Sequence, residues 1–187
     1  MYFRLARIGK ILLVWHILNR VLEDLLTFIC QIDLEELAPH DTGNELPHHG
    51  MLYFFADLDY FLGDYDADCE GLGFWNEEAS RVIYCPEKCD LHTHEVRWAD
   101  GSSAALPAER IEFTGVPHNE SGHKLLGIPF FDEVSEECGG MVSLLQLDED
   151  DRWRFRLYDV GNMNFMISKE ALAARDFSKV QLYVHCM

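Results

Sequence analysis

Basic residues are scarce in this sequence. Its 187 residues include 15 lysines and arginines against 33 aspartates and glutamates, which gives a formal net charge of −18. Such a negative field repels phosphate backbones and anionic lipid headgroups, so nucleic acids and acidic membranes are disfavoured as partners. Solubility alone is the simpler explanation of this charge, and a basic protein partner is the functional alternative.

Proline and glycine are few as well, with 6 and 13 residues, whereas hydrophobic residues make up 48% of the chain and aromatic residues 12%. This composition excludes the fibrous and disordered classes and is typical of globular proteins. A chain of this length suits one domain, which buries roughly two thirds of the surface that its unfolded form exposes. We therefore expect a single core.

A long uninterrupted apolar run is also lacking. Residues 2–26 are locally basic and repeat apolar side chains at three- and four-residue steps. This pattern predicts an amphipathic N-terminal helix over residues 1–26, ahead of a main domain at residues 27–187. His16 and Arg20 interrupt the apolar positions, so neither a signal peptide nor a transmembrane span fits. A helix packed on the domain is favoured, with an interfacial membrane helix as the alternative.

The cysteine pattern does not indicate a disulfide framework. An even number of cysteines suits disulfides in a small secreted chain, but this chain is neither small nor poor in core residues. We expect most of the thiols to be reduced, which indicates a cytoplasmic protein. The six cysteines are Cys30, Cys69, Cys85, Cys89, Cys138 and Cys186.

The fingerprints of common enzyme classes are missing. The sequence holds no Gly-x-Ser-x-Gly nucleophile elbow, phosphate-binding loop or dinucleotide-binding fingerprint. No cysteine stands in a recognisable nucleophile context. An enzyme is therefore less favoured than a binding protein, and no cofactor is predicted apart from the zinc considered below.

Short segments rich in aromatic and β-branched residues, separated by turn residues, dominate the chain from residue 27 onward. They predict a mainly β (α+β) fold, a roll of antiparallel strands with a few short helices. The most regular alternation of apolar and polar residues lies at 153–158. Asp33 and Ser168 predict N-caps for short helices over residues 34–37 and 170–175. The predicted strands cover residues 27–32, 51–57, 81–85, 94–98, 110–113, 141–147, 153–158, 163–167 and 180–185.

Two pairs of segments echo each other along the chain. Residues 28–33 (FICQID) resemble residues 143–148 (SLLQLD), and residues 50–55 (GMLYFF) resemble residues 161–166 (GNMNFM). The same order in both halves predicts a twofold pseudo-repeat. The simpler alternative is that all four segments are generic strands.

Four residues between positions 85 and 94 are weak zinc candidates. They are Cys85, Cys89, His92 and His94. The Cys-x₃-Cys spacing occurs in structural zinc sites, but the His-x-His spacing is less usual, and one short segment rarely completes a tetrahedral site alone. A strand and turn without metal is the favoured interpretation.

A short acidic motif imitates the start of a calcium-binding loop. Asp64, Asp66 and Asp68 have the right spacing, but Cys69 and Trp75 occupy the positions that require glycine and glutamate. An EF-hand is therefore excluded, and a solvated acidic turn is expected, with weak adventitious calcium binding as the alternative.

A second acidic set has the residue types of a glycoside-type acid–base pair. Asp57 and Asp59, with Glu77 and Glu78, could supply the two carboxylates. Because carboxylates are abundant in this chain, the signal is weak.

Several segments match motifs of one known family in order. Residues 28–33 and 50–55 match the paired strands φ-φ-Q-I-D/N and G-φ-φ-x-F-F, and residues 123–131 match H-K-φ-φ-G-x-P-x-F. Residues 159–167 and 175–180 match G/D-x-G-x-x-N-F-φ-I and R-D-F-S-x-V. From about residue 27 to its end, the chain thus resembles the YwqG-like family, domain of unknown function 1963.

This resemblance implies a mainly β, roll-like fold and no established activity. Within it, the loop that carries His123 and Lys124 could contact a ligand, although a turn that shapes the core is the favoured interpretation. Asp159, Asn164, Arg175 and Asp176 are likewise interpreted as structural, with the Asp and Asn side chains holding backbone amides. The residues that carry the family motifs are Gln31, Asp33, Gly50, His123, Lys124, Gly127, Pro129, Gln146, Asp159, Gly161, Asn164, Phe165, Arg175, Asp176 and Phe177.

Residues 1–26 depart from the family pattern, in which a glycine- and proline-rich segment leads into the first strand. The difference raises the hypothesis of a misassigned start codon or an upstream frameshift. Intact mass and amino-terminal sequencing of the native protein would test it.

Taken together, the acidic composition, the missing catalytic fingerprints and the resemblance favour a non-enzymatic protein-interaction or binding module. One version is an immunity-type partner of a basic toxin, which rests on analogy and charge. The alternative is an enzyme or small-ligand-binding protein whose site lies in a groove between the pseudo-repeats, with carboxylates and His123 as candidates. The sequence leaves the partner, the ligand and the oligomeric state open.

Overall fold

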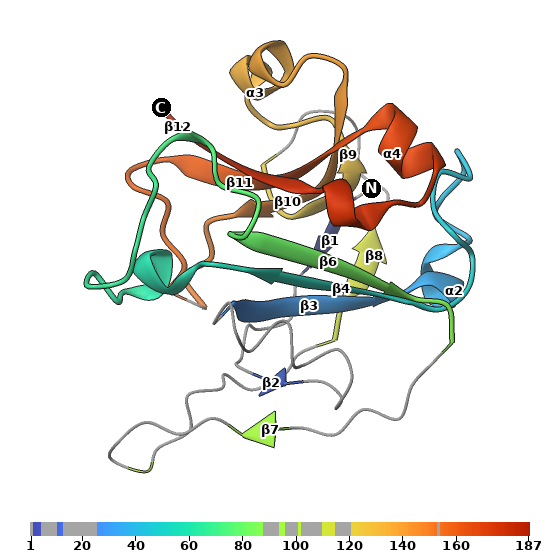
Figure 1. Ribbon diagram of the computed structural model, residues 1–187, viewed down its shortest axis with the longest axis horizontal. Helices are drawn as coiled ribbons and strands as arrows, with labels where there is room; N and C mark the ends of the chain where they lie inside the picture. Colours follow the sequence, from blue (N-terminus) through green and yellow to red (C-terminus); the bar gives the residue numbers. More distant parts are fainter. Residues whose placement is uncertain are drawn as a thin grey trace.

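The computed structural model describes residues 2–4, 11–12, 26–87, 94–95, 101, 110–114, 121–152 and 154–187. Strands make up most of the regular structure in these residues, and the helices are short (Figure 1). All of the described strand pairings are antiparallel. The expectation of a mainly β fold is confirmed.

The smaller of the two main sheets is built from the first half of the chain. It contains β3 (Thr27–Asp33), β4 (Met51–Ala56) and β6 (Ser80–Cys85), with β4 in the middle. Every residue of β4 is buried. A central strand that is covered on both faces carries a continuous apolar run instead of an alternating one, as the sequence MLYFFA does.

The larger sheet has seven strands among the described residues, in the order β5-β12-β11-β10-β9-β1-β8. Its centre comes from the second half of the chain, where successive strands are neighbours. Strands β2 and β7 form a separate pair. The bounds are β1 (Tyr2–Arg4), β2 (Ile11–Leu12), β5 (Gly73–Phe74), β7 (His94–Glu95), β8 (Glu112–Thr114), β9 (Lys124–Gly127), β10 (Met141–Asp148), β11 (Gly161–Ser168) and β12 (Gln181–Cys186).

Short helices connect the strands, and both predicted N-caps are confirmed. The carboxylate of Asp33 accepts from the backbone N–H groups of Glu35 and Glu36 at 3.0 and 3.4 Å, and the hydroxyl of Ser168 accepts from that of Ala171 at 3.1 Å. These bonds satisfy donors that the first helical turn leaves without partners. No described helix is long and apolar enough to cross a membrane. The helical segments are α2 (Leu34–Leu37), η1 (Asp59–Leu62), α3 (Asp132–Glu137), α4 (Lys169–Ala173) and η2 (Phe177–Lys179).

The two main sheets lie face to face and share one apolar core (Figure 1). Phe54 of β4 and Phe165 of β11 meet within it, with ring centroids 5.5 Å apart and planes at 86°. Both rings are fully buried, and the edge-to-face arrangement is a favourable one for aromatic pairs. Apolar side chains thus fill the space between the two sheets, and a ligand groove at the junction of the repeats stays a prediction.

The predicted twofold pseudo-repeat is confirmed by strand register. Gln31 lies opposite Tyr53 in the β3–β4 pair, and Gln146 lies opposite Asn164 in the β10–β11 pair. In each pair a β-bulge interrupts the register between the third and first residues before the glutamine. The third strands, β6 and β12, then pair with β4 and β11 in corresponding register. The phenylalanines that meet in the core also occupy corresponding positions, as residues beside a local twofold axis do.

Two corresponding glycines show why the motif needs this residue. Gly50 directly precedes β4 and Gly161 begins β11. A Cβ atom on Gly50 would lie 2.2 Å from the carbonyl oxygen of Cys85, and one on Gly161 would lie 2.7 Å from that of His185. Cys85 and His185 are themselves corresponding residues of β6 and β12. Only glycine fits where the backbone of the third strand comes this close.

The strand predicted over residues 153–158 is wrong. In the described part of this segment, Phe155 forms an isolated bridge with Asp150, and Arg154 and Tyr158 have φ angles of 57° and 60°. Positive φ does not occur in a regular strand. Phe155 and Leu157 are nevertheless buried, and Arg154 and Arg156 are exposed, as the alternation predicts. The segment therefore forms a turn whose side chains alternate in burial as those of a strand do.

Other boundaries also differ from the predictions. Strand β9 lies within residues 123–131, which we interpreted as a loop or turn, and Leu126 in it has a φ of 50°. The strand predicted at 110–113 begins later, with β8. Of the strand predicted at 94–98, only β7 lies within the described residues.

The N-terminal stretch is described only in part. Residues Tyr2–Arg4 form β1, which pairs with β8 and β9, and Ile11–Leu12 form β2. The predicted amphipathic helix therefore does not include those residues. The rest of residues 1–25 lies outside the described residues, and the division between 1–26 and 27–187 stays a prediction.

Candidate functional site

Four polar side chains form a line across one face of the larger sheet. Lys124, Gln146, Asn164 and Tyr183 occupy directly opposed positions on β9, β10, β11 and β12, so they share a face. They are only 2%, 1%, 0% and 3% exposed. We call them the polar row, and we call residues 128–140, which carry α3, the cover, because they lie on this side of the sheet (Figure 1).

Hydrogen bonds attach the polar row to the cover. The backbone N–H of Phe130 donates to Gln146 Oε1 at 2.8 Å, and Gln146 Nε2 donates to the carbonyl oxygen of Gly122 at 2.8 Å. The hydroxyl of Tyr183 donates to the carboxylate of Glu137. Next to these bonds an apolar cluster, which includes residues of α3 and its flanks, packs on the ring of Tyr183. The underside of the cover is therefore polar on one side and apolar on the other.

Lys124 is a buried amine within this row. Its Nζ donates to the carbonyl oxygen of Ile128 at 3.0 Å and lies 5.7 Å from the ring centroid of Phe130. Burial lowers the pKa of Lys124, and the carboxylate of Asp148 opposes this shift. A Cβ on Gly127 would lie 3.1 Å from the Cβ of Lys124, so this motif glycine makes room for the lysine side chain.

A chain of side-chain hydrogen bonds runs from Ser143 to Asn162. The hydroxyl of Ser143 donates to Asn164 Oδ1 at 2.9 Å, and Asn164 Nδ2 donates to Asn162 Oδ1 at 2.8 Å. The next donor, Asn162 Nδ2, is buried and has no hydrogen-bond partner in the part of the chain that the structure describes. The chain therefore ends in an unused donor, which is costly to bury.

His123 ties β9 to the turn after β10. Its Nδ1 accepts from the backbone N–H of Asp148 at 3.1 Å, so the ring proton is assigned to Nε2, which lies 3.5 Å from the carboxylate of Asp150. Asp150 also accepts from Arg152 Nε at 3.0 Å. Burial alone would raise the pKa of Asp150, but the hydrogen bonds from His123 and Arg152 hold it well below its usual range. His123 has a positioning role here, with both ring nitrogens engaged.

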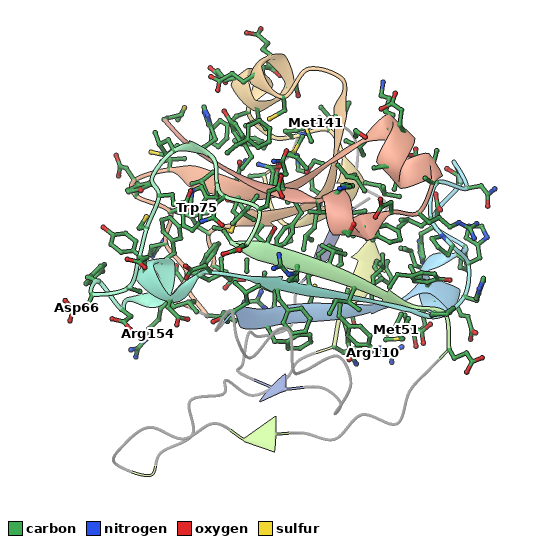
Figure 2. All side chains as sticks on the ribbon, in the orientation of Figure 1. Met51, Asp66, Trp75, Arg110, Met141 and Arg154 are labelled. Atoms are coloured by element: carbon green, nitrogen blue, oxygen red, sulfur yellow. The ribbon has the colours of Figure 1, made fainter. Side chains whose placement is uncertain are left out.

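A second feature lies at another end of the molecule. Figure 2 labels Asp66 far from Met141, the residue that directly follows the cover. Asp66 belongs to residues 57–78, which we call the acidic loop. Its exposed carboxylates form no ion pair with a described basic residue. They are Asp64, Asp66, Asp68, Glu70, Glu77 and Glu78.

The carboxylates of the acidic loop lie close enough to affect one another. Burial raises the pKa of Asp57, and the nearby carboxylates of Asp59, Asp68 and Glu70 raise it further. The hydroxyl of Thr27 donates to Asp59 at 2.7 Å. Asp57 and Asp59, two members of the predicted acid–base set, thus lie close together, and their pairing with residues 77 and 78 stays a prediction.

Exposed aromatic side chains accompany these carboxylates. Tyr65 is 77% exposed and contacts Tyr60, with ring centroids 5.6 Å apart. Tyr158 is 45% exposed, and its hydroxyl lies 3.4 Å from the sulfur of Cys69. This hydrogen bond, together with burial, raises the pKa of Tyr158 to about 12. The acidic loop and the turn before β11 therefore share one surface.

Sequence reasoning missed two signals of these features. Between Arg20 and Arg81 the chain has no lysine or arginine, and the acidic loop lies within that gap. In β11, Asn162 and Asn164 alternate with apolar residues in a strand that is buried almost throughout. Amide side chains at alternate positions of a buried strand indicate a hydrogen-bonded polar network on one face of that strand, where a simple core would have apolar side chains.

The remaining motif residues have structural positions. Phe165 and Phe177 belong to the core, and Pro129 is buried. Gln31 is exposed on β3, in contrast to its counterpart Gln146. Asp159, Arg175 and Asp176 are exposed, and Asp176 accepts from the hydroxyl of Ser178 at 2.5 Å. The interpretation that Asn164 holds a backbone amide is wrong, because its side chain bonds two other side chains.

The predicted zinc ligands stay a prediction. Cys85 is buried at the end of β6 and His94 begins β7, but Cys89 and His92 lie outside the described residues. Among the residues that the structure does describe, no three His, Cys, Asp or Glu side chains are grouped to hold a metal ion. The described cysteines are free thiols.

Comparison with protein families gives one match over most of the chain. The model of a family described as Domain of unknown function (DUF1963) matches residues 19–186. The match begins ahead of residue 27, where we expected the resemblance to start, and it contains both halves of the pseudo-repeat. A search of curated proteins finds no match.

Proposed function

Since the chain belongs to the DUF1963 family, a domain of unknown function, we propose a role from its surface: it is a non-enzymatic protein-interaction module whose acidic loop binds a basic partner protein. The observation that carries this proposal is the group of exposed carboxylates in residues 64–78 without a described basic residue as ion-pair partner. Clustered charges of one sign steer a partner of the opposite sign and select against partners of the same sign.

Exposed apolar side chains give this surface a second property of protein interfaces. Tyr65, Leu72 and Phe74 are 77%, 57% and 44% exposed within the acidic loop. Tyrosine and phenylalanine are enriched where proteins meet, because their rings bury large areas at low entropic cost. Tyrosine rings also attract lysine and arginine side chains through cation–π contacts. The carboxylates and rings together suit a partner with exposed basic side chains.

A substitution series tests this proposal with matched charge. The variant D64N/D66N/D68N and the control E133Q/E136Q/E170Q remove the same number of exposed carboxylates, the first from the acidic loop and the second from α3 and α4. Asparagine keeps an acceptor for the backbone bond that Asp66 N–H makes to the residue 64 side chain. We expect a basic protein to be captured from a lysate of the native source by wild type and control and lost with the loop variant.

Salt dependence and identity of the captured protein complete the test. Capture should weaken as ionic strength rises, because exposed charges are screened beyond about 10 Å at 0.1 M salt. Equal capture by both variants, or capture of unrelated basic proteins in proportion to their charge, would mean ion exchange and would contradict the proposal. For the immunity-type version, the captured protein should arrest growth when expressed alone, and co-expression of this chain should restore growth.

A further inference from the structure

The face of the sheet beneath the cover holds more buried polar side chains than selection for stability alone would favour. A lysine and three amide side chains, Gln146, Asn162 and Asn164, lie under residues 128–140 at exposures of 2% or less. Apolar residues of similar volume at buried polar positions are often neutral or stabilising. Positions where a sequence departs from such local rules are frequently functional.

Most hydrogen-bonding groups on this face are matched, which makes the exception informative. The Gln146 amide and the Tyr183 hydroxyl bond the cover or its neighbour, and Asn164 is satisfied at both ends of its side chain. The exception is Asn162 Nδ2, which has no partner in the described chain. Its position on β11 is opposite Asp148 on one side and His185 on the other. The missing partner must be a hydrogen-bond acceptor.

We propose that this face is a binding site for a small molecule that presents a carbonyl or carboxylate oxygen, with Asn162 Nδ2 as a donor and the cover as the element that opens to admit it. The amine of Lys124 places a positive charge on the same buried face. The oxygen of the ligand would take the free amide proton of Asn162. This site is independent of the acidic loop and of any protein partner that the loop binds.

The cover is built as a segment that can move as a unit. It begins after Gly127 and ends before Gly140, whose φ is 85° and whose Cβ position is open. Residues of this kind absorb backbone changes at hinges. Of its contacts with β9 and β10, those of Ile128 and Phe130 are backbone hydrogen bonds to the Lys124 and Gln146 side chains. Water can replace these bonds when the cover lifts, whereas the apolar contacts of Phe131, Val134 and Cys138 with Met166 and Tyr183 must also separate and set the cost of opening.

The side-chain amide signal of Asn162 in a nitrogen–proton correlation spectrum tests the site directly. Sodium acetate and acetamide serve as probes for a carboxylate and for a neutral carbonyl, and sodium chloride controls for ionic strength. We expect a saturable shift of the Asn162 signal with at least one probe, while the exposed Asn44 amide stays unchanged. A buried water would also satisfy Asn162, but it gives no saturable response.

Two variants separate a binding site from a structural network. S143A/N162L/N164L removes every member of the hydrogen-bond chain, so no partner is left unpaired. It should fold, and the backbone amide signal of residue 162, which should also shift in wild type, should no longer respond to the probes. K124M keeps the length of the side chain without its charge and should weaken acetate about tenfold relative to acetamide. A response to acetamide alone, unaffected by K124M, would identify a neutral carbonyl ligand.

Two results would overturn the proposal, and neither requires the variants to fold. The first is an Asn162 signal that neither probe shifts. The second is a shift that tracks ionic strength and appears equally at Asn44. Because the acidic loop takes no part in this measurement, failure here leaves the partner proposal standing, and failure of partner capture leaves this one standing.

Discussion

The two halves of the molecule have the same strand arrangement but carry different side chains at corresponding positions. Both have a bulged first strand, a glycine against the third strand and a phenylalanine at the contact between the sheets. In the first half the central positions carry Gln31, Tyr53 and Ile83, and the glutamine is exposed. In the second half they carry Gln146, Asn164 and Tyr183, all buried under the cover. This comparison indicates that the repeated strands provide a common framework, and that the polar side chains found only in the second half form the candidate site on it.

The contact between the halves is where the largest effect is expected. Phe54→Ala and Phe165→Ala should each lower the free energy of unfolding by about 3–5 kcal/mol, since each removes a fully buried ring. Because the rings contact each other, the double variant should deviate from the sum of the two by about 0.5–3 kcal/mol. Urea unfolding measures the cycle, and strict additivity would show that the pair is not a shared centre.

The corresponding glycines test whether the repeat is needed in both halves. Gly50→Ala should destabilise by about 3 kcal/mol or more, because the new Cβ meets the Cys85 carbonyl and φ is positive. Gly161→Ala should cost about 1–3 kcal/mol, since its φ lies outside the left-handed region and its closest contact is longer. The control Gly139→Ala has an ordinary contact of 3.6 Å and should be close to neutral. Equal unfolding midpoints for all three would contradict the close approach seen in each half.

Lys124 is a charge buried in the second half, and its effect on stability should depend on pH. Its lowered pKa means that Lys124 binds more protons in the unfolded chain at alkaline pH, so the stability of wild type relative to K124M should rise as pH increases through the folded pKa toward about 10.4. The raised pKa values of Cys30, Cys138, Tyr158 and Tyr183 lower the stability of both proteins in this range, so only the difference isolates Lys124. At neutral pH K124M should be equal to wild type or more stable by about 1–2 kcal/mol, and this advantage should disappear at alkaline pH. Chemical unfolding at several pH values measures it. A stability difference between wild type and K124M that does not change with pH would mean that Lys124 carries its charge at no cost.

The helix caps provide the smallest and most symmetrical comparison. Asp33→Ala and Ser168→Ala each remove a side-chain acceptor for backbone donors and should cost about 1 kcal/mol. Substitution by asparagine at position 33 should cost less, because asparagine also caps helices. Thermal unfolding monitored by circular dichroism would detect the change. A much larger loss at one position would show that its helix supports more of the core than the other.

Local patterns explain which parts of the fold could be predicted. The strands of both repeats were found because runs of β-branched and aromatic residues bounded by turn residues favour strands. The strand predicted over residues 153–158 was wrong for a physical reason. Burial alternates whenever successive side chains point to opposite sides. Here a turn with positive φ at Arg154 and Tyr158 gives that alternation without a strand. Strand β9 was missed because its four residues pair with distant neighbours and include Leu126 in a left-handed conformation.

The candidate sites were predictable to different degrees. The motif residues Lys124, Gln146 and Asn164 were identified one at a time, but their alignment into one row depends on register between strands far apart in sequence. Asn162 was not predicted as a site residue, because whether its side-chain donor has a hydrogen-bond partner depends on the folded structure around it. The acidic loop was visible as a run of carboxylates, whereas its exposed rings and the proximity of Tyr158 required the structure.

The sequence by itself determined the strand-rich character of the chain, its negative field, its two helix caps and the order of its repeat. Each of these depends on residues close together in the chain or on simple sums, so local rules are sufficient. Only the tertiary structure decided that the space between the repeats is apolar core and that the polar motif residues lie on the opposite face, beneath residues 128–140. Which face of a strand is covered, and by what, depends on contacts between distant segments, and no local pattern contains that information.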